Sequence, residues 1–242
     1  MIHSIDLKSG YPRGIETRSR AHEAVSVAIG SRDYVVGSSA DHSTVRVYRR
    51  GTSQVLWTET ERERGGCDRL ALHDPLFARE DHDLLAVGAR DGRVLLYDAG
   101  HGELLHELEK TSKSKIVALC FSPDGTKVAA AGSDAQVTIW SAKEGGEPLI
   151  EFEARAGQGI STLVFADKGP LLAIGHSSGL LEIWDLKGRL QRAFPRDGRD
   201  LDDRAQGSAT PVSGVVFDEE VVLWSVFDRV YHIDLASPRQ DR

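Results

Sequence analysis

The chain has 242 residues, 40% of them hydrophobic, and a formal net charge of −7 at pH 7. It contains no apolar run of about 18 residues, and no apolar stretch with a small-residue cleavage site stands near its start, so neither a membrane span nor a signal peptide is indicated. The negative net charge argues against nucleic acid as the main partner, because that binding depends on Lys and Arg neutralising phosphates. We therefore expect a cytoplasmic protein that does not bind membranes.

One alternating pattern recurs along the whole chain. Its copies, in chain order, are "IHSIDL" (2–7), "TVRVYRR" (44–50), "GRVLLYDA" (92–99), "AQVTIWSA" (135–142), "GLLEIWDL" (179–186) and "VYHIDLAS" (230–237). An alternation over about five residues is typical of a half-buried strand. Each copy contains one large apolar residue that we call its landmark, and the landmarks follow one another at intervals of 43 to 49 residues: Ile5, Tyr48, Tyr97, Trp140, Trp184 and Ile233.

Further strands are predicted around these landmarks. A second strand with a small-residue turn precedes the landmark, as in "LLAVGARDG" (84–92) and "LLAIGHSSG" (171–179). Before it, a first strand is marked by an apolar pair such as Ile116 and Phe121, and a fourth strand follows the landmark, as in "ELLHEL" (103–108). Four short strands in every 40 to 50 residues, with Gly, Asp and Ser turns between them, is the pattern of a β-propeller blade.

The repeats resemble those of the WD-repeat propeller family. The stretch "FSPDGTKVAAAGSDAQVTIW" (121–140) is the most similar, and the family's dipeptide stands at Trp184-Asp185. No repeat carries the family's full hydrogen-bonding set of His, Ser or Thr, Asp and Trp, and only His22 is a candidate for the family's histidine. At the family's turn aspartate, six residues before the landmark, this chain has His42, Asp91, Asp134 and Ser178, with Asp228 one position out of place.

We predict an all-β chain that forms a single β-propeller domain over 1–242, with about five four-stranded blades and an N-terminal part-blade. The part-blade covers 2–18, the blades cover about 22–60, 67–110, 114–154, 158–195 and 211–236, and 196–210 is a flexible loop. Two arrangements stay open. In a closed five-bladed ring, residues 2–7 are the outermost strand of the last blade and 11–19 are a connecting loop; in an open arc, exposed edges imply a second chain.

Motifs that suggest chemistry have simpler explanations. "GHSSG" (175–179) fits G-x-S-x-G with Ser177 as nucleophile, but that motif needs a strand, a strained elbow and a helix, whereas the equivalent stretches here are hairpin turns.

His101 and His106 fall on opposite faces of a strand, and the acidic stretches 79–83 and 197–203 lack metal-ligand spacing. Cys67 and Cys120 show no zinc or disulfide pattern, and we expect both to be small buried side chains. We predict no catalytic residue, no cofactor and no metal.

The resemblance implies a non-enzymatic scaffold or sensor module, a docking subunit of a larger assembly that binds protein partners, one of which could be a chain that completes the propeller. Fold alone does not establish function. Two alternatives are a hydrolase on a propeller scaffold and a nucleic-acid binder that uses the arginines of 13–20 and 46–50. The family's turn aspartates look structural, which would apply to Asp41, Asp91 and Asp134. If a partner binds the rim that carries the turns between second and third strands, the candidates are His22, Asp41, His42, Arg90, Asp91, Lys113, Asp134, His176, Ser178, Asp228 and Arg229.

Overall fold

The fold is all-β, as predicted. The computed structural model describes residues 2–5, 12–15, 27–29, 34–38, 44–49, 54–60, 66–73, 83–109, 114–155, 159–194, 211–218, 221–226 and 229–235. Every regular element in these residues is a strand, so none of them belongs to a helix that could cross a membrane. The chain divides into two compact units, Met1–Ile116 and Val117–Arg242. We call them the N-terminal unit and the C-terminal unit.

The N-terminal unit holds three sheets. A two-stranded sheet pairs β1 (Ile2–Ile5) with β2 (Pro12–Ile15). The other two have four strands each, and consecutive strands pair antiparallel: β3 (Val27–Ile29), β4 (Tyr34–Ser38), β5 (Thr44–Arg49) and β6 (Val55–Thr60) in one, β7 (Cys67–His73), β8 (Leu84–Ala89), β9 (Val94–Asp98) and β10 (Leu104–Leu108) in the other.

A hydrophobic core lies between the two four-stranded sheets of this unit. Val45 and Val47 of β5 contribute to it from one sheet, and Leu85 and Val87 of β8 from the other. All four side chains are buried. Side chains two positions apart on a strand point to the same face, so the period-2 pattern of the sequence accounts for this packing.

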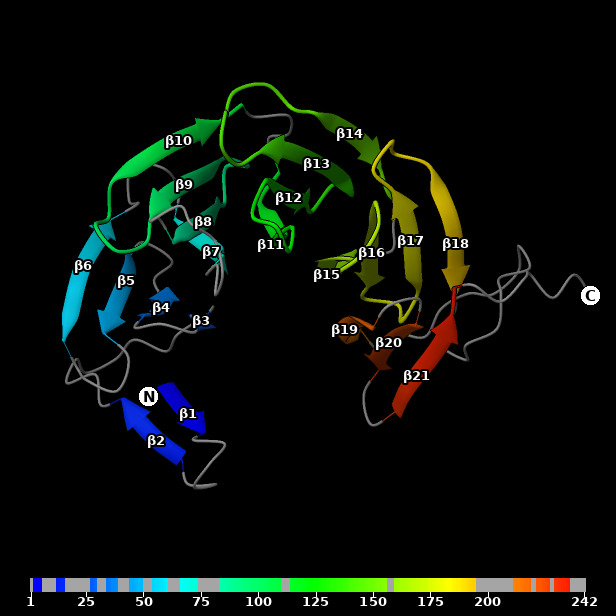
Figure 1. Ribbon diagram of the computed structural model, residues 1–242, viewed down its shortest axis with the longest axis horizontal. Coiled ribbons are helices and arrows are strands. Elements are labelled where there is room, and N and C mark those ends of the chain that lie inside the picture. The colour runs from blue at the N-terminus through cyan, green and yellow to red at the C-terminus, as the bar shows by residue number, and fades with distance from the viewer. Residues whose placement is uncertain are drawn as a thin grey trace, which may run out of the picture. The chain divides into compact units, whose positions relative to one another are not determined.

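The C-terminal unit also holds three antiparallel sheets (Figure 1). Two have four strands and the third has three. The first sheet consists of β11 (Ile116–Phe121, which begins at the last residue of the N-terminal unit), β12 (Lys127–Gly132), β13 (Gln136–Ser141) and β14 (Ile150–Glu153). The second consists of β15 (Ile160–Phe165), β16 (Leu171–His176), β17 (Leu181–Asp185) and β18 (Leu190–Phe194). The third consists of β19 (Val212–Asp218), β20 (Val221–Val226) and β21 (Arg229–Asp234).

Two cores join the three sheets of this unit. Between the first and second sheets, the rings of Phe152 and Trp184 stack with their centroids 4.5 Å apart. Between the second and third, Phe194 packs against Trp224, with the centroids 5.8 Å apart. The first strands of the sheets lie close together and the last strands lie farther apart (Figure 1), which is the radial stacking of a propeller.

The first strand of the chain pairs with the second. β1 pairs with β2, and β2 falls within the stretch 11–19 that the closed-ring alternative assigned to a connecting loop. Among the described strands, β21 pairs only with β20. The stretch 11–19 is therefore not a connecting loop throughout, because Pro12–Ile15 forms a strand. The predicted loop 196–210 lies outside the described residues.

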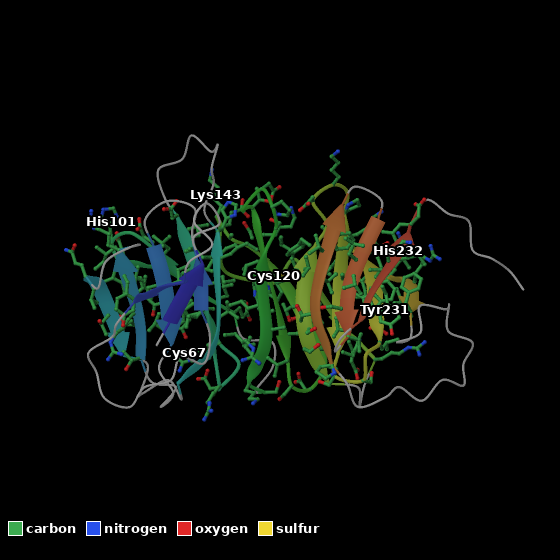
Figure 2. All side chains as sticks on the ribbon, turned by 90° about the horizontal axis from the view of Figure 1, so that it is seen from below. Cys67, His101, Cys120, Lys143, Tyr231 and His232 are labelled. Atoms are coloured by element: carbon green, nitrogen blue, oxygen red, sulfur yellow. The ribbon has the colours of Figure 1, made fainter. Side chains whose placement is uncertain are left out.

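Both cysteines are free (Figure 2). Cys67 is buried in the core of the N-terminal unit, as expected, and Cys120 is half-buried. Cys120 packs against the core between the first two sheets of the C-terminal unit. Burial of its thiol raises the pKa to about 12, opposed by a hydrogen bond with the backbone of Phe165. A thiol with so high a pKa is almost never the reactive thiolate.

Candidate functional site

The turn between β8 and β9 carries two predicted rim residues, Arg90 and Asp91. Arg90 is exposed and Asp91 is half-buried. Oδ1 of Asp91 accepts a hydrogen bond from the backbone N–H of Arg93 at 3.2 Å, and Oδ2 lies 2.7 Å from Nε of Arg93. Arg93 also lies 3.3 Å from the carboxylate of Glu107 on β10. Asp91 is therefore bound within its own hairpin, which agrees with the structural interpretation of the turn aspartates.

The corresponding turns of the C-terminal unit flank one connection. The backbone N–H of Ala154 donates to the carbonyl of Ala135, and the N–H of Ser177 donates to the carbonyl of Gly159, at 3.0 and 2.7 Å. The connection after β14 therefore lies between the β12–β13 turn and the β16–β17 turn. We call residues 133–135, 154, 155, 159 and 177–179 the C-terminal rim.

Asp134 is the exposed aspartate of this rim. Its Oδ1 accepts a hydrogen bond from the backbone N–H of Gln136 at 3.2 Å. The next residue, Ala135, has a φ of +69°, a left-handed conformation that costs an alanine about 1–2 kcal/mol. The surrounding hydrogen bonds hold this turn in one shape, so the exposed side chains of the rim are presented on a rigid backbone.

Ser177 lies in a hairpin turn, as interpreted from the sequence. β16 ends at His176 and β17 begins at Leu181, and the N–H of His176 donates to the carbonyl of Leu180 at 2.9 Å. A strand follows where a nucleophile elbow would need a helix. Ser177 itself is exposed, and Nε2 of the neighbouring His176 contacts Glu182.

A buried ionic network lies beneath the C-terminal rim. Oε2 of Glu182 accepts a hydrogen bond from Nε1 of Trp184 at 3.0 Å and lies 3.1 Å from Nε2 of His176. Oε1 of Glu182 is 3.4 Å from Nε of Arg155, whose side chain is 43% exposed. Neither His176 nor Glu182 is exposed. Arg155 therefore reaches from the surface to a carboxylate inside the protein.

This network was not predicted from the sequence. His176 was predicted as a rim residue, but its side chain is buried and points to Glu182. The available signal was Glu182 itself, an acidic residue between Leu181 and Ile183 and two positions before the landmark Trp184. That spacing places Glu182 on the same strand face as the tryptophan, where a charge must find partners.

Three buried polar atoms in or next to this network have no hydrogen-bond partner among the described residues. They are Nδ1 of His176, Oγ of Ser178 and Oε1 of Glu182, and Oε1 has only the ion pair with Arg155. Such atoms are uncommon in native structures. The end of the β16–β17 hairpin thus combines a charged network with unsatisfied polar atoms, which the equivalent β12–β13 turn does not show in the described residues.

At the opposite ends of the sheets, aspartate side chains accept hydrogen bonds from the backbone of the turns. Oδ1 of Asp185, in the family's dipeptide, accepts hydrogen bonds from the N–H groups of Lys187 and Arg189 at 2.9 and 3.0 Å. Desolvation acts to raise the pKa of Asp185, but these bonds and that from the Arg189 side chain outweigh it, so the pKa is lowered. Asp98 holds the corresponding turn in the N-terminal unit.

Other predicted sites give no catalytic geometry within the described residues. His101 is largely exposed and lies 3.1 Å from Asp98, while His106 lies on β10. Asp91 and Asp134 belong to different units. In the part of the chain that is described, no group of three or more His, Cys, Asp or Glu side chains is arranged to hold a metal ion.

Several predicted rim residues fall outside the described part of the chain. The side chain of Arg229, the first residue of β21, is also not described. The residues outside the described part are His22, Asp41, His42, Lys113 and Asp228, together with 79–82 and 197–203 of the acidic stretches.

One family model matches part of the chain. The model described as "WD domain, G-beta repeat" matches residues 102–141, from the turn before β10 to the end of β13. The chain therefore contains a WD repeat at residues 102–141. Its four-stranded antiparallel sheets fit a WD-repeat β-propeller, as the sequence resemblance predicted.

Curated relatives are WD-repeat proteins of several kinds. The chain is 29% identical over 162 residues to "Small ribosomal subunit protein RACK1y" of Oryza sativa subsp. japonica, which covers 64% of this chain and 44% of the relative. It is 26% identical over 166 residues to "WD repeat-containing protein 1" of Gallus gallus, covering 68% and 26%. A match to "Small ribosomal subunit protein RACK1" of Brassica napus is 31% identical over 123 residues, covering 44% and 37%. The matches therefore span less than half the length of these relatives.

Proposed function

We propose that this protein is a non-enzymatic scaffold or sensor module, a docking subunit of a larger assembly. Protein partners would bind the rim of turns between second and third strands, and one partner could be a chain that completes the propeller. Relatives that are named as small ribosomal subunit proteins support a role within a large assembly and a cytoplasmic location. The function of those relatives belongs to longer chains, so for this chain it is a proposal.

The rigid C-terminal rim is the observation that carries the proposal. Asp134 binds its own backbone, and the connection after β14 is hydrogen-bonded to both neighbouring turns. The exposed side chains of Asp134, Arg155 and Ser177 therefore stand on a preorganised backbone, which lowers the entropy lost on binding.

The test compares variants at the two ends of the sheets. Asp134→Arg and Ser177→Arg change the C-terminal rim, while Glu144→Arg places the same side chain on the exposed β13–β14 turn. Each tagged variant is expressed in the source cells, and its copurifying proteins are quantified by mass spectrometry. We expect stoichiometric partners of the wild type to fall at least about tenfold with the rim variants and to persist with Glu144→Arg.

Equal recovery of every partner with all variants would contradict rim docking. A substrate panel with purified protein tests the enzymatic alternative: turnover that Ser177→Ala abolishes would instead support a hydrolase. Circular dichroism checks that each variant is folded before either result is interpreted.

A further inference from the structure

We propose that Arg155 is the residue of the C-terminal rim that recognises the partner, and that it binds a carboxylate group in an acidic segment of that protein. The inference rests on the proposed docking function and adds the chemistry of the partner. Two observations carry it. A buried glutamate holds the guanidinium group in place, and in the described part of the chain the guanidinium has no other hydrogen bond or ion pair.

Glu182 is a fixed anchor for this guanidinium. Its Oε2 accepts a hydrogen bond from Nε1 of Trp184 at 3.0 Å and lies 3.1 Å from Nε2 of His176. The carboxylate is fully buried, and its Oε1 lies 3.4 Å from Nε of Arg155. Phe152 on β14 stacks against Trp184 on β17, and Figure 1 shows the end of β14 close to β17. This stacking brings the residues after β14, Arg155 among them, to the buried carboxylate.

The terminal nitrogens of Arg155 are available to a ligand. The side chain is 43% exposed, and it is Nε that contacts Glu182. The two terminal nitrogens of a guanidinium can donate to both oxygens of one carboxylate at once. An unattached arginine loses side-chain entropy when it binds a ligand, whereas this arginine is already held at its Nε. Arg155 is therefore preorganised to bind one planar anion.

The fold does not require the buried charges beneath Arg155. His176 and Glu182 stand eight and two positions before the landmark Trp184. At the two equivalent positions, the β7–β10 sheet and the β11–β14 sheet carry buried residues without charge: Ala89, Leu95, Gly132 and Thr138. A buried ion pair generally stabilises a fold less than well-packed apolar residues in the same place. A charged network that only one of these three sheets carries therefore indicates a functional role.

The charges around Arg155 favour a ligand with a single negative charge. Glu182 already offsets the charge of the guanidinium, and the exposed Asp134 lies on a turn that is hydrogen-bonded to the same connection. A phosphate group carries about −1.5 to −2 charges at pH 7 and would face both carboxylates. The side chain of an Asp or Glu carries one negative charge and matches the guanidinium in shape. The ligand is therefore an acidic segment of a protein and not a phosphorylated one.

Peptide selection on the pure full-length chain tests the proposal. A phage-displayed library of random peptides is selected on the immobilised protein, and the enriched peptides are synthesised so that their dissociation constants can be measured. We expect these peptides to share an Asp or a Glu. Replacing that residue by Asn or Gln should weaken binding to the wild type at least about tenfold, because charge-assisted hydrogen bonds are lost.

Arg155→Gln should weaken binding of the acidic peptide by a similar factor and leave binding of the amide peptide unchanged. A merely structural role of Arg155 would not give this result, since a distorted rim would weaken both peptides alike. Arg155→Lys keeps a charge beside Glu182 but cannot bind a carboxylate through two nitrogens, so its loss should be smaller. It replaces Arg155→Gln if that variant does not fold. Arg189→Gln is the control and should change neither peptide, because it removes an exposed guanidinium that is paired with Asp185 at the opposite end of the sheet.

Three results would overturn the inference. They are enriched peptides without a common acidic residue, an Arg155→Gln variant that weakens the acidic and amide peptides equally, and a phosphoserine version of the peptide that binds more tightly than the acidic one. Peptides without an acidic residue whose binding falls with Ser177→Arg would overturn this inference alone and leave rim docking standing. If no peptide depends on the rim at all, the result counts against both proposals.

Discussion

Nε2 of His176 lies 3.1 Å from Oε2 of Glu182, and neither side chain is exposed to solvent. The indole N–H of Trp184 donates to the same oxygen, and Arg155 approaches the other oxygen. A buried carboxylate with these partners is a stable arrangement only while all of them are present. The family's hydrogen-bonding set, which no repeat of this chain carries, is replaced in this repeat by a different one that also ends on the landmark tryptophan.

Glu182→Ala should destabilise the protein by about 3 kcal/mol or more, because it leaves the buried His176 and Trp184 donors without an acceptor. Glu182→Gln keeps an oxygen acceptor of similar shape and should cost less. Equilibrium urea unfolding, followed by circular dichroism, measures both. Glu151→Ala, on an exposed position of β14, is the control and should change the free energy of unfolding by less than about 0.5 kcal/mol. A Glu182→Ala variant as stable as this control would show that the network contributes nothing.

The strands were predictable from short apolar runs between turn residues, although β13 is buried on both faces and not half-buried as its alternation suggested. The landmark Trp140 and its neighbours alternate along β13, and Ile139 and Trp140 pack into different environments on its two faces. The turns were predictable because Gly179 has a φ of +87°, a conformation that glycine adopts at little cost. Periodicity and turn residues are local properties, so one sequence displays them directly.

The buried network could not be predicted in the same way, because its members come from three different segments. Arg155 follows β14, His176 ends β16 and Glu182 lies in β17. Only the packing of two sheets brings Arg155 to Glu182. The same holds for β1, whose sequence resembles the landmark strand of the last repeat and so suggested two possible partners. Its pairing with β2 depends on which strand lies nearer, and alternation contains no information on that.

Gly175 should not accept a side chain. A Cβ at this position would lie 2.7 Å from the side chain of Thr162 and 2.8 Å from that of Val212 on the neighbouring sheet. Gly175→Ala should therefore destabilise the protein by about 1–3 kcal/mol through overpacking. Gly214→Ala is the matched control, because a Cβ there meets only Oγ of Ser225 at an ordinary 3.4 Å. Thermal unfolding of both variants measures the difference, and equal melting temperatures would contradict the close approach of the sheets.

Asp124 should make stability depend on pH in the acid range. Desolvation acts to raise its pKa, but hydrogen bonds from Ser122 and Thr126 dominate and lower the pKa from 3.8 to about 2. A lowered folded-state pKa means that the carboxylate stabilises the fold above pH 3.8 and that this contribution disappears as the pH falls toward 2. The difference in unfolding free energy between the wild type and Asp124→Asn should therefore be constant from pH 7 to about 5 and shrink below about 4. Urea unfolding at several pH values measures it, and a difference that grows toward low pH would contradict this assignment.

Alanine substitutions at Gly102 and Gly146 distinguish the cost of backbone strain from the cost of a steric clash. Both glycines have a φ of +74°, but their surroundings differ. A Cβ on Gly102 would lie 2.7 Å from the ring of Trp57, whose Nε1 donates to the carbonyl of Ala99 at 2.8 Å, whereas a Cβ on Gly146 meets nothing within 4 Å. Gly146→Ala should cost about 1 kcal/mol from the left-handed conformation alone. Gly102→Ala should cost about 1–3 kcal/mol more, since the indole must move and its hydrogen bond weakens. Urea unfolding gives both free energies, and the emission maximum of tryptophan should shift only in Gly102→Ala. If the two variants lose the same stability, Trp57 does not pack on the β9–β10 turn as described.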